Sequence, residues 1–457
     1  MYHIILIITI AQLLSLTLTQ ASYVNPSIQS HIHDSLYSHR PLSPIHSLYS
    51  SQWCIGGKGR SGTAAERSCL FHNLCYNTDT KQYVYYRNSS ERNHAILADH
   101  GYIINKFTAD DQHITTKTNS YLQLSVKSWY EPDNVYMTPV IVDSSIPKSN
   151  VEWLGTPDDI TVIHHSINTH NTGQYLLDTL FVQYILMSSF GVLTSNMQPI
   201  YTSSCQQQYT KPEQIQLCMN SIQQYTSGLT SRQPIFISQI KSTVLQCYSQ
   251  VLVGSGPFGL QSSWGRGSIY RSFRHYYLSN LGFNSDLSTS STNQPIIAIL
   301  SFGKLRYNKL TNAAALRQHL HQHIKGSQVQ LIDMTSYNTL SDYIKFLQST
   351  HIIIQPAGSI GLTGILMNEN SCVINIDTYD INKKKSYGTE ERLWSSLGYL
   401  HTYNYPVLKN EIQLPAGNAN QLNNNEWREA GEITIELDRM VTIVQAALDK
   451  MHNFAVV

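Results

Sequence analysis

The sequence carries little charge of either sign. Only 13% of its 457 residues are Asp, Glu, Lys or Arg, against roughly 25% in an average soluble protein. The 31 basic and 30 acidic residues leave a formal net charge of +1, whereas a protein that binds nucleic-acid phosphates needs a large positive excess. We therefore exclude general nucleic-acid binding. Uncharged polar residues and 29 tyrosines replace the missing charge, a composition that favours a lumenal or secreted protein acting on hydroxyl-rich ligands.

The sequence also lacks the usual metal-binding spacings. No Asp-x-Asp occurs anywhere, so the carboxylate clamp that commonly holds a metal ion on a nucleotide-sugar is absent. The cysteines form no C-x-x-C pair, which disfavours a zinc knuckle. His164, His165 and His170 offer a zinc alternative, but they lack the i, i+4 spacing of two histidine ligands on one helix. We predict no metal site and no cofactor.

The cysteines fit an oxidising compartment, in which some of them pair as disulfides. Cys372 stands inside a short apolar run and is expected to be a buried, unpaired residue. The sequence does not fix which of the others pair with one another. An N-glycosylation sequon at Asn88 fits the same compartment. The candidates for disulfide bonds are Cys54, Cys69, Cys75, Cys205, Cys218 and Cys247.

The first residues resemble a targeting segment. The apolar run Ile4–Thr19 is shorter than the roughly 20 residues that span a bilayer comfortably. We predict a signal peptide over residues 1–21, cleaved after Ala21. Because Met1–His3 contains no Lys or Arg, a retained signal anchor stays open as the alternative, and it would be the only membrane attachment. Residues 22–50 have the composition of a tether.

The apolar pattern after residue 51 predicts an α/β fold. Pro295–Leu300 and Cys372–Ile376 are typical of fully buried parallel strands, and Gly173–Leu186 and Ala313–His323 have helical spacing. The polar run Ser288–Asn293 has linker composition, so we predict one domain over 51–287 and another over 288–457. The remaining predicted elements are strands at Asp159–Ile163, Val329–Ile332 and His351–Ile354 and helices at Thr339–Leu347 and Leu362–Met367.

Three segments could bind phosphate. The turn Gln355–Gly361 lies between a strand and a helix, where helix N–H groups and glycines let backbone amides approach a diphosphate; an ordinary tight turn is its alternative. Lys304 and Arg306 follow the strand that ends at Leu300, although surface residues of this kind are common. Gly254–Gly259 matches G-x-G-x-x-G but lacks the acidic residue about 20 positions on that ribose binding requires.

A carboxylate on the first predicted helix is a candidate for proton transfer. Asp178 stands between Leu177 and Leu180, and a carboxylate beside an apolar helix face is costly unless it is paired or functional. Such a group can act as a general base toward a hydroxyl. A solvent-facing or capping aspartate is the alternative.

Several of these segments together resemble glycosyltransferase family 61. Cys69–Tyr76 is similar to the family's Cys-x-Phe-x-Asn-x-Cys-Tyr segment, and Asn171–Asp178 to its Asn-x-Gly-His-x-x-x-Asp helix start. Val253-Gly254 with Phe273-Arg274 resembles the end of its first domain, and Ile353–Ile376 resembles its nucleotide-side strand, glycine turn, helix and strand.

The resemblance implies a GT-B fold, in which two Rossmann-like domains face each other across a cleft. It further implies an inverting transfer of a sugar, a pentose or N-acetylglucosamine, from a UDP-sugar to a hydroxyl of a glycan or glycoprotein, in the Golgi or endoplasmic reticulum lumen or after secretion. On this basis Asp178 is the expected base, and Asn171 and Gln174 lie on the acceptor side. The expected donor-binding residues are Arg274, Lys304, Arg306, Gly358, Ser359 and Gly361.

The sequence departs from the family at three polar positions. Gln174 and Gly358 stand where the family has His, and Asn375 stands where a Glu is common. A catalytically inactive carbohydrate-binding relative therefore remains the alternative function. An oxidoreductase would depend on Gly254–Gly259 alone and is the weaker alternative.

Overall fold

The computed structural model describes most of the chain after residue 47, and Leu48–Val457 form one compact unit. Several sequence predictions lie outside the described residues. They are the signal peptide, residues 22–47 of the tether, most of the glycine-rich segment from Gly254, the domain boundary, and the candidate residues Lys304 and Arg306. Within 48–457 the segments not described are 56–67, 89–95, 99–101, 105–123, 126–135, 138, 166–168, 170, 241–243, 255–264, 284–293, 302–308, 334–336, 338, 357, 381–382, 389, 414–431 and 455–457.

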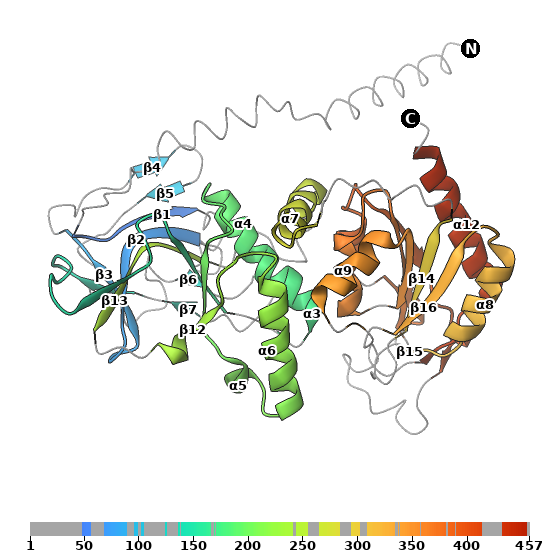
Figure 1. Cartoon of the computed structure of the whole chain (residues 1–457), viewed down its shortest axis with the longest axis horizontal. Helices are drawn as coiled ribbons and strands as arrows, with labels where there is room; N and C mark the ends of the chain where they lie inside the picture. Colours follow the sequence, from blue (N-terminus) through green and yellow to red (C-terminus); the bar gives the residue numbers. More distant parts are fainter. Residues whose placement is uncertain are drawn as a thin grey trace, which may run out of the picture. The chain divides into compact units, whose positions relative to one another are not determined.

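An 11-stranded mixed sheet forms the first half of this unit (Figure 1). Its centre is an antiparallel pair of long strands, β2 (Ser68–Asn77) and β13 (Leu245–Gly254). On the far side of β2, β1 (Ser51–Ile55) and β3 (Gln82–Tyr86) pair with its two ends. The other strands are β4 (Ile96–Ala98), β5 (Tyr102–Ile104), β8 (Val140–Val142), β9 (Val151–Leu154), β10 (Ile160–His164), β11 (Gln198–Tyr201) and β12 (Ile235–Phe236).

Disulfides hold both ends of β2. Cys69 is bonded to Cys54 and Cys75 to Cys247, and each pair stands directly opposite in neighbouring strands. A third disulfide links Cys205 to Cys218, while Cys372 is a buried free thiol. The structure therefore confirms the six predicted disulfide cysteines and the unpaired one, and it excludes the six as zinc-binding thiolates.

Only part of the first sheet has Rossmann-like character. β10, β11, β12 and β13 run parallel, whereas the strands on the other side of β13 are mainly antiparallel. The predicted helix at Gly173–Leu186 is confirmed. It consists of α3 (Thr172–Gln174), a π-helical segment η5 (Tyr175–Leu180) and α4 (Phe181–Ser189).

Two further helices of the first half were not predicted from the sequence. α6 (Pro212–Thr226) has a narrow buried stripe and exposes Leu217 and Met219, so its apolar period is weak. α7 (Gly267–Asn280) buries mainly tyrosines, Phe273 and Arg274. The remaining short elements here are α5 (Cys205–Gln208), η6 (Ile237–Gln239), and the two-stranded pair β6 (Leu124–Ser125) and β7 (Tyr136–Met137).

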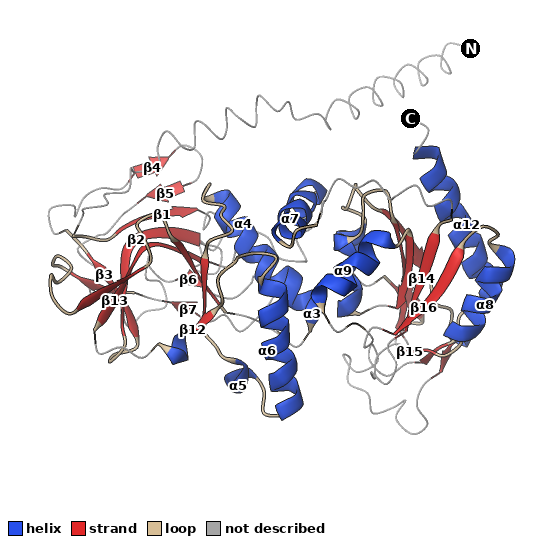
Figure 2. Ribbon diagram, in the orientation of Figure 1, coloured by secondary structure: helices blue, strands red, loops and turns tan. Residues whose placement is uncertain are grey.

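The second half contains a five-stranded parallel sheet in the order β16-β14-β17-β18-β21 (Figure 2). Helices cover both of its faces, because Ile297 and Ile299 of β14 pack with α8 while Ala298 and Leu300 pack with α9. The sheet consists of β14 (Ile296–Ser301), β16 (Gln328–Asp333), β17 (Ile352–Pro356), β18 (Cys372–Ile376) and β21 (His401–Tyr405). Its main helices are α8 (Ala313–His323), α9 (Leu340–Ser349), η9 (Ser359–Leu366) and α12 (Leu437–Phe454).

The predicted strands and helices of this half agree with the structure to within about three residues at their ends, and the predicted α/β class is confirmed. Two sheets of α/β type are the arrangement expected of a GT-B chain. No helix among the described residues is long and apolar enough to span a bilayer. The small elements are β15 (Lys309–Leu310), β19 (Thr378–Asp380), β20 (Lys385–Tyr387), α10 (Glu391–Trp394), η10 (Lys409–Glu411), β22 (Ile412–Gln413) and β23 (Glu432–Ile433).

The disulfide that joins Cys75 to Cys247 should stabilise the fold most. It closes a loop of 172 residues, against 13 for Cys205–Cys218, and the entropy removed from the unfolded chain grows with loop length. We expect the C75A/C247A variant to lose about 2 kcal/mol more unfolding free energy than C205A/C218A, measured by denaturant titration. An equal loss in the two variants would contradict this account. In the denatured wild type, maleimide should label one thiol before reduction and seven after it.

Candidate functional site

The order of strands in the parallel sheet locates the candidate site. β14 comes first in the chain, the next strand β16 pairs on one side of it, and β17 pairs on the other. The strand order therefore reverses between β14 and β17: the chain first adds β16 on one side of β14 and then β17 on the other. Doubly wound sheets bind ligands beyond the carboxyl ends of the strands at such a reversal. Lys304 and Arg306 follow β14 in sequence, and the glycine turn follows β17. β14 and β17, the strands that these two segments follow in the sequence, run parallel side by side and end at the same sheet edge.

The glycine turn connects β17 to η9. Gly358 is exposed, and a Cβ atom placed on it would meet nothing within 4 Å. Gly361 is different, because a Cβ atom there would stand 2.9 Å from Cδ of Gln355. The first turn of η9, which begins at Ser359, leaves backbone N–H groups without partners inside the helix. The turn therefore combines an open position, a tightly packed one and N–H groups suited to an anion.

Two buried carboxamides lie beneath this turn. Gln355 of β17 and Asn375 of β18 are register neighbours, and Gln355 Nε2 donates a hydrogen bond of 2.8 Å to Asn375 Oδ1. Their exposed fractions are only 2% and 6%. Gln355 Oε1 and Asn375 Nδ2 have no hydrogen-bond partner among the described residues. The sequence analysis named Gln355 as the start of the glycine turn and Asn375 as a departure from the family, but it did not identify that the two side chains pair.

Asp377, directly after β18, is a second group that the sequence analysis missed. It is buried, with one carboxylate oxygen accepting a 2.9 Å hydrogen bond from Ser386 Oγ. The pKa of Asp377 is raised to about 6, mainly by burial and in smaller part by the nearby Glu391 carboxylate, while the Ser386 hydrogen bond lowers it. Its position after a buried apolar strand was the signal available in the sequence.

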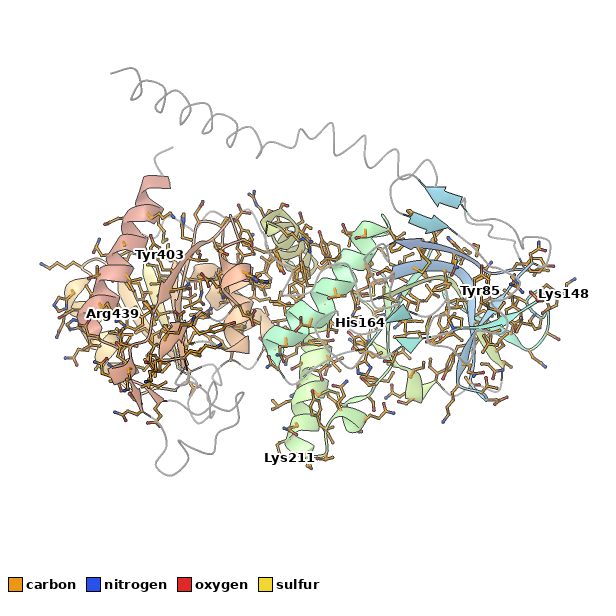
Figure 3. The ribbon with its side chains drawn as sticks, turned by 180° about the vertical axis from the view of Figure 1, so that it is seen from behind. Tyr85, Lys148, His164, Lys211, Tyr403 and Arg439 are labelled. Carbon is orange, nitrogen blue, oxygen red and sulfur yellow. A yellow bond between two sulfur atoms is a disulfide. The ribbon has the colours of Figure 1, made fainter. Side chains whose placement is uncertain are left out.

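The predicted base, Asp178, lies inside η5 and is 4% exposed. Its backbone lies against His164, which ends β10 and is fully buried (Figure 3). The pKa of His164 is lowered to about 3, mainly by burial and in smaller part by the neighbouring His165, while the Asp178 backbone acts in the opposite direction. His164 is therefore neutral at physiological pH, and the structure brings it to Asp178 from a different element.

The two residues predicted on the acceptor side lie at the start of α3. Asn171 is the N-cap, and its side-chain oxygen accepts from the Gln174 backbone N–H at 3.2 Å. Gln174 is half-buried. α3 packs against η9, so the predicted acceptor-side helix start and the predicted donor-side turn come from separate sheets and meet.

The structure shows which groups Arg274 contacts. Its side chain is fully buried on α7, where Nε donates 2.6 Å to the Met367 carbonyl and Nη2 donates 3.3 Å to Asn368 Oδ1. The Glu369 carboxylate lies 3.7 Å away and also pairs with Arg271 and His275. These hydrogen bonds join α7 to the end of η9, and the contact of Arg274 with a donor stays a prediction.

Asn88, the predicted glycosylation site, follows β3 and is half-buried.

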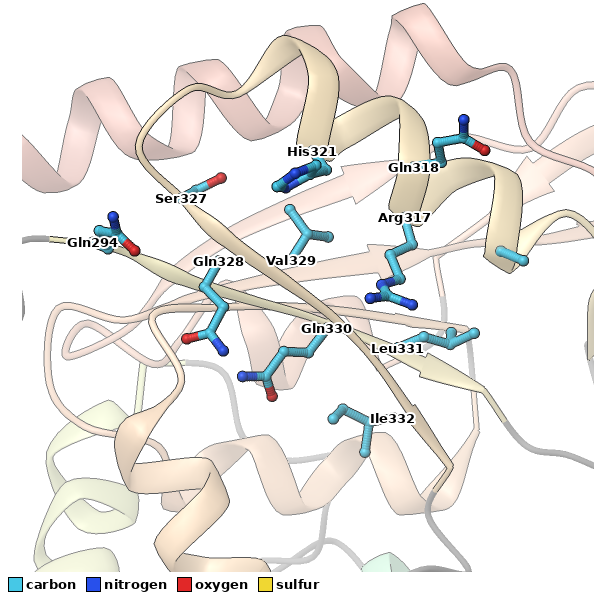
Figure 4. A pocket seen from close by; sticks show the side chains of 11 residues that line it. Gln294, Arg317, Gln318, His321, Ser327, Gln328, Val329, Gln330, Leu331 and Ile332 are labelled. Atoms are coloured by element: carbon cyan, nitrogen blue, oxygen red, sulfur yellow. The ribbon is translucent and has the colours of Figure 1, made fainter.

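A separate groove of about 850 Å³ lies along the edge strand β16 and α8 (Figure 4). Its lining is mostly polar and includes Arg317, His321 and Gln330. None of the described residues that were predicted to bind donor or acceptor lines this groove.

Comparisons with known proteins give matches among solved structures only. No protein-family model matches the chain, and no curated protein matches its sequence. The iron-containing dodecameric glycosyltransferase TibC of enterotoxigenic Escherichia coli aligns at 10% identity and a TM-score of 0.31, covering 88% of this chain and 96% of that one.

The heptosyltransferase WaaC of Escherichia coli also matches, in two structures. With ADP bound it aligns at 8% identity and a TM-score of 0.26, over 63% of this chain and 99% of that one. With ADP-2-deoxy-2-fluoro heptose it aligns at 7% identity and a TM-score of 0.24, over 53% of this chain and 92% of that one.

The two glycines of the turn should differ in their tolerance of a methyl group. We expect Gly361→Ala to lower the unfolding free energy by about 1–3 kcal/mol, because the added Cβ would clash with Gln355. Gly358→Ala is the matched control, with an added Cβ in open space. Thermal unfolding of both variants checks this, and equal melting temperatures would show that the contact between Gly361 and Gln355 is not tight.

Asp377 should make the protein less stable as the pH rises. Its native pKa of about 6 exceeds the ordinary value of 3.8, so the unfolded chain loses this proton first and native stability falls between about pH 4 and pH 6. Asp377→Asn should therefore raise the unfolding free energy by about 1–2 kcal/mol at pH 7.5, after allowance for solvent screening. At pH 4 the gain should be much smaller. Melting temperatures at both pH values test this, and a gain that does not depend on pH would contradict it.

Proposed function

We propose that the protein transfers a sugar from a nucleotide-sugar, a UDP-sugar, to a hydroxyl of a glycan or glycoprotein. The observation that carries this proposal is the contact of α3 with η9. η9 follows β17, and the strand order of the parallel sheet reverses between β14 and β17. A doubly wound sheet binds ligands at such a reversal, and the N–H groups at the start of η9 suit a diphosphate. The resemblance to glycosyltransferase family 61 assigns the same segments to the donor and the acceptor.

The transfer is proposed to invert the anomeric centre. The acceptor hydroxyl oxygen attacks the anomeric carbon, the bond from that carbon to the diphosphate oxygen breaks, and the nucleoside diphosphate leaves with the bonding electrons. Asp178 accepts the proton of the acceptor hydroxyl. The backbone N–H groups after Gly358 stabilise the negative charge that develops on the leaving group, and Lys304 and Arg306 add positive charge.

The disulfides support a location in the secretory pathway. All three connect residues inside the first half of the chain, and such bonds persist in oxidising compartments. We propose the lumen of the Golgi or endoplasmic reticulum, or secretion, as the place of action, where glycans and glycoproteins are also the available acceptors.

Purified protein incubated with a panel of nucleotide-sugars tests the proposal. We expect release of the free nucleotide from one donor, faster when an acceptor glycan is present. Binding of a donor without turnover would instead assign the chain to a catalytically inactive carbohydrate-binding relative, which the polar departures at Gln174, Gly358 and Asn375 favour. Neither binding nor release would reject both functions.

Asp178→Asn tests the assignment of the base. We expect this variant to lose at least about 100-fold in transfer rate, because a general base contributes roughly 10²–10⁴-fold. Donor binding should remain, since the base acts on the acceptor. Asp449→Asn on α12, which changes the same chemical group on the far helix, is the matched control. Unchanged turnover of Asp178→Asn would remove this residue as the base.

A further inference from the structure

The space beside the Gln355–Asn375 pair has the chemistry of a hydroxyl-binding site. It is a narrow pocket at the carboxyl ends of β17 and β18, with room for about one water-sized group. Among the described residues that line it, Glu390 is the only charged one. Gly358, the exposed residue of the glycine turn, stands at its rim. The described residues that line it are Gln355, Pro356, Gly358, Leu362, Asn375, Ile376, Glu390 and Trp394.

The two carboxamides both line this space, and together they keep one acceptor atom and one donor atom without a partner. Their mutual hydrogen bond uses Gln355 Nε2 and Asn375 Oδ1, which leaves Gln355 Oε1 as an acceptor and Asn375 Nδ2 as a donor. Both side chains are more than nine-tenths buried, and a buried polar atom without a partner costs about 1–3 kcal/mol. A group that both donates and accepts would satisfy the two atoms together.

A hydroxyl group meets this requirement, and a phosphate oxygen does not. A hydroxyl donates one hydrogen bond and accepts up to two, so it can donate to Gln355 Oε1 and accept from Asn375 Nδ2. A phosphate oxygen only accepts, which would leave Gln355 Oε1 without a partner and would place a negative charge near Glu390. The diphosphate therefore belongs at the N–H groups after Gly358 and the hydroxyl belongs in the pocket beside them.

We propose that Gln355 and Asn375 bind one hydroxyl group of the donor, on its ribose or on its sugar, and thereby select donors that carry a hydroxyl at that position. This assignment rests on the proposed function, because the donor must bind at the glycine turn to bring a hydroxyl to the pocket. It goes further in naming the two residues that determine specificity and the group they recognise.

The surroundings hold the carboxamide pair in place. Gly361 lets η9 approach Gln355 closely, with its virtual Cβ at 2.9 Å from Gln355 Cδ. The parallel register of β17 and β18 sets Gln355 opposite Asn375. Trp394 closes the other side and would stand 3.3 Å from a Cβ on Gly364. Selectivity for a hydroxyl group requires such fixed partners, because a mobile side chain could turn its unpaired atom toward water.

Calorimetric titration with deoxy analogues tests the proposal. Wild-type protein is titrated with UDP, 2′-deoxy-UDP and 3′-deoxy-UDP, and separately with UDP-glucose and its monodeoxy analogues. We expect one analogue to bind about 10- to 100-fold more weakly than its parent, since removing the hydroxyl leaves two buried atoms without partners. The series in which the loss occurs shows whether the hydroxyl belongs to the ribose or to the sugar.

Asn375→Leu removes the donor side of the pair at similar volume. In this variant we expect the selected parent ligand to bind about 10-fold more weakly and the preference over its deoxy analogue to disappear. Asn404→Leu is the matched control, because Asn404 is the exposed register neighbour of Asn375 on β21 and does not line the pocket. Melting temperatures check that both variants fold. If Asn375→Leu does not fold, the titration of the wild type with the deoxy analogues tests the hydroxyl proposal by itself.

The outcomes separate the two proposals. If neither UDP nor UDP-glucose binds, the proposed function fails for this donor class. If they bind and every deoxy analogue binds as tightly as its parent, the proposed function stands, the hydroxyl proposal is overturned, and the pocket holds a water molecule only. The hydroxyl proposal is also overturned if Asn375→Leu still binds the deoxy analogue more weakly than the parent ligand by the same factor as the wild type does.

Discussion

The parallel pairing of β14 with β17 is the constraint on which the candidate site depends. Their register places Ile297 beside Ile352 and Ile299 beside Ile354, so the two strands end at one edge. The chain reaches β17 only after leaving β14 toward the opposite side, through α8, β16 and α9. The carboxyl ends of β14 and β17, about fifty residues apart in the chain, therefore lie side by side. Without this pairing, the glycine turn would be an ordinary connection between a strand and a helix.

Burial determines the hydrogen bonding and the pKa values of the polar groups at this edge. Gln355 and Asn375 end two apolar strands whose neighbouring residues fill the hydrophobic cores on both faces of the sheet. In such surroundings each polar atom must find a partner or carry a cost. Two of the four polar atoms of the pair bond to each other, and the other two, one acceptor and one donor, suit a hydroxyl. Asp377 shows the same constraint in another form, since burial raises its pKa to about 6.

Contacts between elements of the two sheets hold the acceptor-side helix against the donor-side turn. α3 packs on η9, and one hydrophobic cluster contains Phe181 of α4, Phe273 of α7 and Leu362 of η9. Arg274 adds hydrogen bonds from α7 to the segment that follows η9. A guanidinium so enclosed is costly to bury unless its hydrogen bonds are made. These hydrogen bonds help to position η9, a role that the sequence analysis did not predict.

The sequence by itself determined the elements whose pattern is local. The apolar runs at 295–300 and 372–376 became β14 and β18, the helical period at 313–323 became α8, and the six predicted cysteines form disulfides, because burial and pairing of these residues follow from their own chemistry. Only the tertiary structure decided which cysteines pair, that Arg274 is enclosed by the end of η9, and that Gln355 stands opposite Asn375. Each of these depends on contacts between residues far apart in the chain, and one sequence carries no record of such distances.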